Sequence, residues 1–248
     1  MKSKIESIIF DVGATLRVVV EDHEFSKAAV DEIIRLVQPR EERGEFMQKL
    51  ENNYKTYRKR AKSILLDVSE IELWVQYMLP DYPQELIAPN AVRLTSLWRD
   101  HDGRRVPRPD VNDTVKELHR RGYKLGIIAN TITEVEIPTW MCDEKIAGYF
   151  HTVILSSKVR IRKPNPEIYL LASRCIGSKP GECAYIGDNP VRDVEGAVKA
   201  GYGAMILLDV PEASERDKVA PYSPDYTIKN ISDLLEMFPR RKDKDAGQ

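Results

Sequence analysis

The fold is decided near the start of the chain, by the stretch Ile5-Glu6-Ser7-Ile8-Ile9-Phe10-Asp11-Val12-Gly13-Ala14-Thr15-Leu16. Residues 5–10 form a short, mostly apolar run, which is typical of a β-strand. An aspartate follows at the carboxyl end of this predicted strand. Because open α/β sheets bind their ligands at the carboxyl ends of strands, the stretch predicts both a strand and a functional residue.

Strands and helices alternate after the proline-rich segment at residues 106–109. Short apolar strands are predicted at residues 123–128, 151–155, 183–186, 204–208 and 226–228. The helices between them end at Gly122, Gly177 and Gly201, since glycine commonly terminates a helix. This alternation predicts an α/β fold with a doubly wound, Rossmann-like parallel sheet.

Residues 17–106 have a different pattern. Apolar residues recur at helical spacing over residues 25–37 and 46–65, Ser69 caps a third helix, and a fourth runs through Pro89 toward Trp98. No stretch of residues 17–105 predicts a strand. We therefore expect residues 1–16 and 107–240 to form the α/β core, residues 17–106 to form an inserted helical cap, and residues 241–248 to be a disordered tail.

The composition excludes several classes of protein. The 248 residues carry 38 basic and 39 acidic side chains and are 42% hydrophobic, so the chain is neither a polycation for nucleic acid nor disordered. No apolar run approaches the roughly 18 residues of a membrane span, and no cleavable signal peptide is evident. Three cysteines without a CxxC pair indicate a reducing, cytoplasmic location. We expect a monomer or homodimer with no nucleic-acid or membrane partner.

Two basic groups lie in or beside the predicted cap. We interpret the stretch at residues 55–62 as a solvated helix face, because its tyrosines fall on the apolar side of the helix. The second group either faces an anionic substrate or faces solvent; it consists of Arg99, Arg104, Arg105 and Arg108.

Five polar residues lie just past predicted strands or in the loops that follow them: Asp11, Asn130, Lys163, Asp188 and Asp193. In a doubly wound sheet these loops converge on one crevice. Three carboxylates in one crevice repel each other unless a cation joins them, and oxygen ligands without histidine suit Mg²⁺. The lysine indicates an anionic ligand. Together these groups suit phosphoryl transfer to an aspartate.

Four segments resemble the motifs of the haloacid dehalogenase-like (HAD) hydrolases, in the family's order and with a helical insertion after the first. They are Ile8-Ile9-Phe10-Asp11-Val12-Gly13-Ala14-Thr15-Leu16, Gly126-Ile127-Ile128-Ala129-Asn130, Arg162-Lys163-Pro164-Asn165-Pro166-Glu167-Ile168-Tyr169 and Ile186-Gly187-Asp188-Asn189-Pro190-Val191-Arg192-Asp193. The core resemblance runs from residue 5 to about residue 240. The cap matches only in its position and helicity.

The resemblance implies a Mg²⁺-dependent phosphatase of a small phosphorylated metabolite. Asp11 would be the nucleophile that forms an aspartyl-phosphate. Mg²⁺ would be bound by Asp11, by the backbone carbonyl of Gly13 and by Asp188. Asp193 would support the metal or orient Lys163, whose ammonium group would neutralise the transferring phosphoryl group.

Two positions depart from the family's pattern. Most relatives carry a second aspartate, which protonates the leaving group, where this chain has Gly13. Losing a positioned acid–base group typically costs about 10²–10⁴ in rate. The serine or threonine that binds the phosphate is replaced by Ala129, so we expect Asn130 or Thr131 to bind it. The expected phosphatase is therefore slow, or restricted to substrates with good leaving groups.

Two alternatives stay open. One is a phosphate-binding or regulatory HAD-like protein with little or no turnover, because positions 13 and 129 lack the usual side chains. The other is an enzyme similar to the phosphonoacetaldehyde hydrolases, which also lack the second aspartate, keep Mg²⁺ and form a Schiff base on a cap lysine. The predicted cap offers several lysines and no motif that selects one of them: Lys27, Lys49, Lys55, Lys59 and Lys62.

Overall fold

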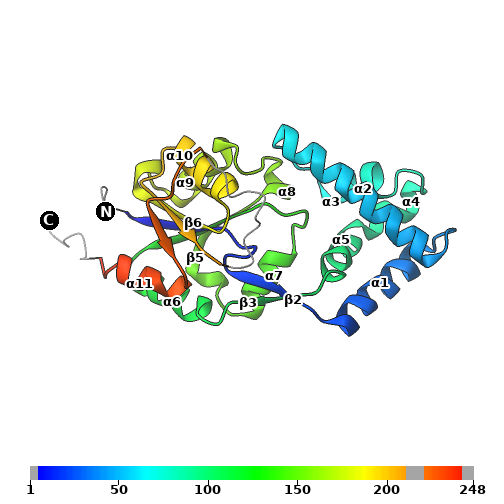
Figure 1. Ribbon diagram of the computed structural model, residues 1–248, viewed down its shortest axis with the longest axis horizontal. Coiled ribbons are helices and arrows are strands. Elements are labelled where there is room, and N and C mark those ends of the chain that lie inside the picture. The colour runs from blue at the N-terminus through cyan, green and yellow to red at the C-terminus, as the bar shows by residue number, and fades with distance from the viewer. Residues whose placement is uncertain (1–4, 211–220, 242–248) are drawn as a thin grey trace.

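The computed structural model describes residues 5–210 and 221–241 of the protein. Its centre is a six-stranded sheet in the order β5–β4–β1–β6–β7–β8, in which all neighbouring strands run parallel (Figure 1). The predicted doubly wound α/β core is therefore confirmed. The strands are β1 (Ser7–Phe10), β4 (Lys124–Ala129), β5 (Phe150–Leu155), β6 (Cys183–Gly187), β7 (Ala204–Leu208) and β8 (Tyr226–Ile228).

Helices cover both faces of this sheet. Alternate side chains of β1 point to opposite faces: Ile8 joins a cluster with Val115, whereas Ile9 joins a cluster with Ile168. Strands of such a sheet are apolar on both faces, which is why Ile8, Ile9 and Phe10 of β1 follow one another without a polar residue between them. The helical elements of the core are α6 (Val111–Arg120), α7 (Glu136–Asp143), η3 (Ala147–Tyr149), α8 (Ser156–Val159), α9 (Pro166–Ile176), η4 (Pro180–Glu182), η5 (Pro190–Glu195), α10 (Gly196–Lys199), η7 (Ile231–Asp233) and α11 (Leu234–Met237).

The helices between residues 23 and 100 bury a hydrophobic cluster of their own, around Phe46, Tyr57 and Trp74. As predicted, Ser69 caps a helix here, because its side chain accepts a hydrogen bond from the backbone N–H of Glu72. The predicted fourth helix is interrupted by a 3₁₀ turn around its proline. These elements are α1 (His23–Val37), α2 (Arg43–Ile64), α3 (Glu70–Glu72), η1 (Leu73–Met78), α4 (Gln84–Ile87), η2 (Ala88–Asn90) and α5 (Ala91–Asp100).

The expectation that residues 17–105 contain no strand is wrong. Strand β2 (Arg17–Val20) leaves the core and pairs antiparallel with β3 (Arg104–Pro107), which returns to it (Figure 1). Each strand has four residues, and two valines of β2 are exposed, so neither strand has the pattern of a buried sheet. Their partners are more than 80 residues apart in the chain. Only the folded chain brings them together, as a two-stranded ribbon between the helices and the core.

A second connection joins the helices to the core beside α2. Leu66 forms an isolated antiparallel bridge with Ile161, and the N–H of Arg162 donates to the carbonyl of Leu65 at 3.0 Å. Asp67 pairs with the Arg162 guanidinium at 2.6 Å, and the hydroxyl of Tyr57 donates to the same carboxylate at 2.7 Å. The residues that directly follow α2 are thus fixed against the loop that carries the predicted Lys163.

No helix among the described residues is both long and apolar enough to cross a membrane. Of the tail predicted at residues 241–248, only Arg241 is described; the other residues lie outside the described part of the chain.

Candidate active site

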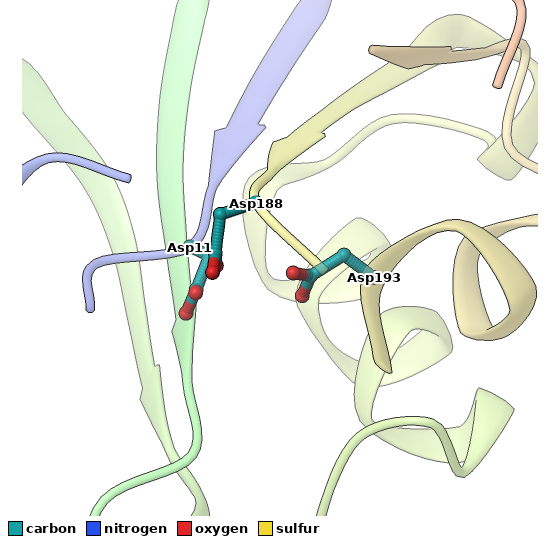
Figure 2. Close-up of side chains that lie close together, drawn as sticks. All are labelled: Asp11, Asp188 and Asp193. Atoms are coloured by element: carbon teal, nitrogen blue, oxygen red, sulfur yellow. The ribbon is translucent and has the colours of Figure 1, made fainter. Parts of the chain in front are cut away.

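Three aspartates meet at the carboxyl edge of the sheet. Asp11 follows β1 and Asp188 follows β6, the neighbouring parallel strand, while Asp193 lies in η5. One carboxylate oxygen from each lies within 4.8 Å of the others. Figure 2 shows the side chains of Asp11 and Asp188 close together, with Asp193 directed toward them. The sequence therefore predicted correctly that these three residues converge.

The turn after β6 determines how Asp193 enters the site. The N–H of Asn189 donates to a carboxylate oxygen of Asp193 at 3.0 Å. A Cβ atom on Gly187 would lie only 2.4 Å from Cγ of Asp193, so a glycine is needed for this close approach. The cap of η5 is Asn189, whose side chain accepts from the N–H of Arg192. Asp188 is therefore not needed as a helix cap, and its carboxylate faces the cluster.

Lys163 connects two of the aspartates. Its side chain is fully buried, and Nζ lies 2.8 Å from Oδ1 of Asp11 and 2.7 Å from Oδ1 of Asp193. It also donates to the hydroxyl of Tyr185 at 2.8 Å. The amide of Asn130 holds the backbone of Lys163 from both sides, with Nδ2 donating to its carbonyl and Oδ1 accepting its N–H. The Asn130 amide thus positions the lysine.

Arg192 also lies among the three aspartates, although the sequence pattern did not predict a role for it. Its Nη2 is 3.1 Å from Asp188, 3.7 Å from Asp11 and 3.9 Å from Asp193. The residue stands four positions after Asp188 in the same motif, and its charge was the signal available in the sequence. Its direction toward the carboxylates depends on the π-helical turn η5, which no local pattern predicts.

The electrostatics of the cluster favour an additional cation. Burial raises the pKa of Asp11, but attraction by Lys163 and Arg192 outweighs it, so the net shift is downward. Burial, together with repulsion from Asp11 and Asp193, raises the pKa of Asp188 to about 7. The positive charges of Lys163 and Arg192 therefore do not fully compensate the negative charge of the Asp188 carboxylate. A set of buried oxygen donors with this excess of negative charge fits Mg²⁺.

The structure leaves open space at the two departures from the family pattern. A Cβ atom on Gly13 would meet no other atom within 4 Å. Ala129 is buried at the end of β4 and offers no hydroxyl. The hydroxyl of Thr131 accepts from the N–H of Thr133 at 3.2 Å, which leaves its own proton available to a ligand. These three positions line a cavity of about 220 Å³.

The arginines at the junction are engaged by protein groups. Glu136, the first residue of α7, lies 2.7 Å from Arg17, 2.9 Å from Arg99 and 3.6 Å from Arg105. Attraction by these arginines overcomes the effect of burial and lowers the pKa of Glu136 to about 2. Elsewhere at the junction, Arg104 pairs with Asp22, and Arg108 donates to the carbonyl of Ala14. This network stabilises the place where the ribbon meets the core.

A model of the haloacid dehalogenase-like hydrolases matches residues 5–201, a span that includes all four motifs. The chain belongs to this family. Its solved neighbours support the fold: the structure of a 2-haloacid dehalogenase from Pseudomonas syringae pv. Tomato superposes with a TM-score of 0.68 at 21% identity, covering 94% of this chain and 97% of that one.

Curated relatives of this HAD hydrolase include named phosphatases. A glyceraldehyde 3-phosphate phosphatase of Methanopyrus kandleri is 31% identical over 137 residues, which are 53% of this chain and 56% of the relative. A pyrophosphatase PpaX of Halalkalibacterium halodurans is 32% identical over 140 residues, 55% of this chain and 62% of the relative. The matched part thus spans less than two thirds of either relative.

Proposed function

We propose that this HAD hydrolase is a Mg²⁺-dependent phosphatase of small phosphorylated molecules, with Asp11 as the nucleophile. The observation that carries the proposal is the position of Lys163, whose buried ammonium group joins Asp11 to Asp193 beside the third carboxylate. A buried lysine at a nucleophile is suited to hold a phosphoryl group against it. The named phosphatases among the relatives support the same chemistry.

The residues of this chain supply the nucleophile and the charge stabilisation of the proposed reaction. An Asp11 oxygen attacks phosphorus, the bond between phosphorus and the ester oxygen breaks, and the alkoxide leaves. Lys163 neutralises charge on the phosphoryl oxygens as it transfers. Water then attacks phosphorus, the bond between phosphorus and the Asp11 oxygen breaks, and inorganic phosphate leaves with both protons of the water, which restores the Asp11 carboxylate. Bound Mg²⁺, held by Asp11, Asp188 and the Gly13 carbonyl with Asp193 in support, would lower the cost of bringing two anions together.

The phosphate needs donors that Ala129 does not provide. The hydroxyl of Thr131 and the backbone N–H of Asn130 would replace them, because both residues line the same cavity as Gly13 and Ala129. The side chain of Asn130 contributes indirectly, because it holds the lysine. With no acid at Gly13, the leaving group takes its proton from solvent, so turnover is slow unless that group is already a weak base.

A regulatory or phosphate-binding role with little turnover is the second candidate. The observation that favours it is that Gly13 has no side chain and Ala129 has no hydroxyl, beside the three aspartates and Lys163. The phosphonoacetaldehyde hydrolase alternative needs a desolvated lysine that forms a Schiff base. Of the five lysines considered for this role, only Lys62 lines the cavity beside Lys163, and it is exposed. The phosphatase is therefore preferred.

Hydrolysis of p-nitrophenyl phosphate tests the proposal, because this leaving group needs little protonation. The wild type is expected to release nitrophenol in the presence of Mg²⁺ and to stop when the metal is chelated. Asp11→Asn should reduce the rate at least about 10³-fold, as expected for loss of a nucleophile. Asp113→Asn, an exposed aspartate of α6, is the matched control and should retain full activity. Activity in Asp11→Asn equal to wild type would overturn the proposal.

The remaining expectations stay predictions: a helical cap at residues 17–106 that covers the site, a cytoplasmic location, and a monomer or homodimer.

A further inference from the structure

A cavity of about 240 Å³ opens beside Lys163, between the core and α2. Its basic lining residues come from both sides: Arg162, Lys163 and Arg192 from the core, and Arg58 and Lys62 from α2. No carboxylate is among the described residues that line it. A cavity of this kind is suited to an anionic ligand larger than the phosphoryl group itself.

The core cations of this cavity already have carboxylate partners. Lys163 pairs with Asp11 and Asp193, and Arg192 lies closest to Asp188. Arg162 pairs with the buried Asp67.

Arg58 of α2 differs from the cations of the core. The guanidinium of Arg58 lies over the ring of Tyr54, 5.7 Å from its centroid, and has no carboxylate partner within the described part of the chain. Lys62 follows four residues later, on the same side of the helix. An anion in the cavity would therefore find in Arg58 a cation that no protein carboxylate occupies.

The position of α2 over the site is fixed by the chain that follows it. Residues 65 and 66 are hydrogen-bonded to residues 161 and 162, directly before Lys163. The hydroxyl of Tyr57, next to Arg58, donates to Asp67. In Figure 1 the C-terminal end of α2, in cyan, accordingly lies on the α8 side of the core. The cations of α2 and the lysine of the core are thus held on opposite sides of one cavity.

We propose that Arg58 and Lys62 bind a second anionic group of the substrate, a carboxylate or a further phosphate, at the end that does not react. The inference rests on the proposed phosphatase function and specifies its substrate class. Both residues belong to the helix face at residues 55–62 and are exposed, and the proposal adds a ligand to this part of that face. Loss of charge-assisted hydrogen bonds of this kind weakens binding by roughly 10- to 100-fold.

Competitive inhibition of p-nitrophenyl phosphate hydrolysis tests the proposal with matched pairs of phosphate monoesters. One pair is 3-phosphoglycerate and glycerol 3-phosphate, which differ by a carboxylate. The other is glucose 1,6-bisphosphate and glucose 1-phosphate, which differ by a phosphate. In at least one pair, wild type should bind the more anionic member at least about 10-fold more tightly than the less anionic member. The pair that shows this preference identifies the second group.

The double variant Arg58→Gln/Lys62→Gln should bring the ratio of the two inhibition constants to about one. The matched control is Lys55→Gln/Lys59→Gln, which removes the same charge from exposed positions of α2 that do not line the cavity; it should keep the wild-type ratio. No preference in either pair for wild type, or an unchanged ratio in the double variant, would overturn the inference.

Calorimetric binding to Asp11→Asn separates this inference from the proposed function. The same pairs are titrated into Asp11→Asn with and without the two α2 substitutions. A preference that depends on Arg58 and Lys62, in a protein whose wild type hydrolyses nothing, would support the anion site and refute the phosphatase. Hydrolysis by wild type, without any preference for the more anionic ligand, would support the phosphatase and refute the anion site.

Discussion

Gly13→Asp is expected to convert a slow site into a faster one. The position follows Asp11 by two residues, and residues two apart on an extended strand end point the same way. The structure has room for the change, because no atom lies within 4 Å of a Cβ built at this glycine. Its backbone is not in the left-handed region, so a side chain adds no strain there. The carboxyl group would enter the cavity shared with Thr131.

The expected gain depends on the leaving group. A positioned general acid contributes about 10²–10⁴ in rate, which corresponds to roughly 3–5 kcal/mol of the activation barrier. For glycerol 3-phosphate, whose alkoxide must be protonated, kcat should rise about 10²-fold or more. For p-nitrophenyl phosphate the rise should stay below about 10-fold, because the nitrophenolate leaves without a proton.

Initial rates of phosphate release, measured for wild type, Gly13→Asp and Gly13→Asn, check this prediction. Asparagine has nearly the same shape as aspartate and has no acidic proton, so it separates acid catalysis from packing. An equal gain for Gly13→Asn would refute the reasoning. A folded Gly13→Asp that gains nothing on glycerol 3-phosphate would refute it as well, since geometry would then not place residue 13 at the leaving group.

Three further predictions concern stability and metal binding. Glu136→Gln should lower the free energy of unfolding by about 3 kcal/mol at pH 7, since the pKa of Glu136 is about 2 in the fold and 4.5 ordinarily. Because this pKa is depressed, the stabilisation is present above pH 4.5 and lost as the pH falls toward 2. Urea titrations between these pH values should show that the free energy of unfolding depends less on pH in the variant than in wild type. Tyr57→Phe should cost about 1.5–3 kcal/mol by the same measurement, because a buried bond to Asp67 is lost. Thermal melts should show that Mg²⁺ stabilises wild type by about 2.7 kcal/mol when the Mg²⁺ concentration is 100 times its Kd. Asp188→Asn should lose this stabilisation. Without metal the variant should melt at a higher temperature than wild type, because burial and repulsion from the neighbouring aspartates raise the pKa of Asp188.

The core and most of the site could be predicted because the relevant signals are local. Mostly apolar runs of three to six residues mark the strands, and the parallel topology then places their carboxyl ends at one edge. Asp11, Asp188 and Lys163 come together as a consequence of that rule. The pairing of β2 with β3 could not be predicted in this way, because each strand is short and half exposed and its partner is distant in the chain.

The sequence by itself therefore determined which residues reach the candidate site, while the tertiary structure decided what each side chain does there. It turned the Asn130 amide to the backbone of Lys163 and directed Arg192 among the carboxylates. It also brought Arg58 of α2 to the cavity beside the lysine. The physical reason is that the positions of strands and helices along the chain follow from local pattern, whereas a side chain's partners depend on contacts between segments that meet only in the folded protein.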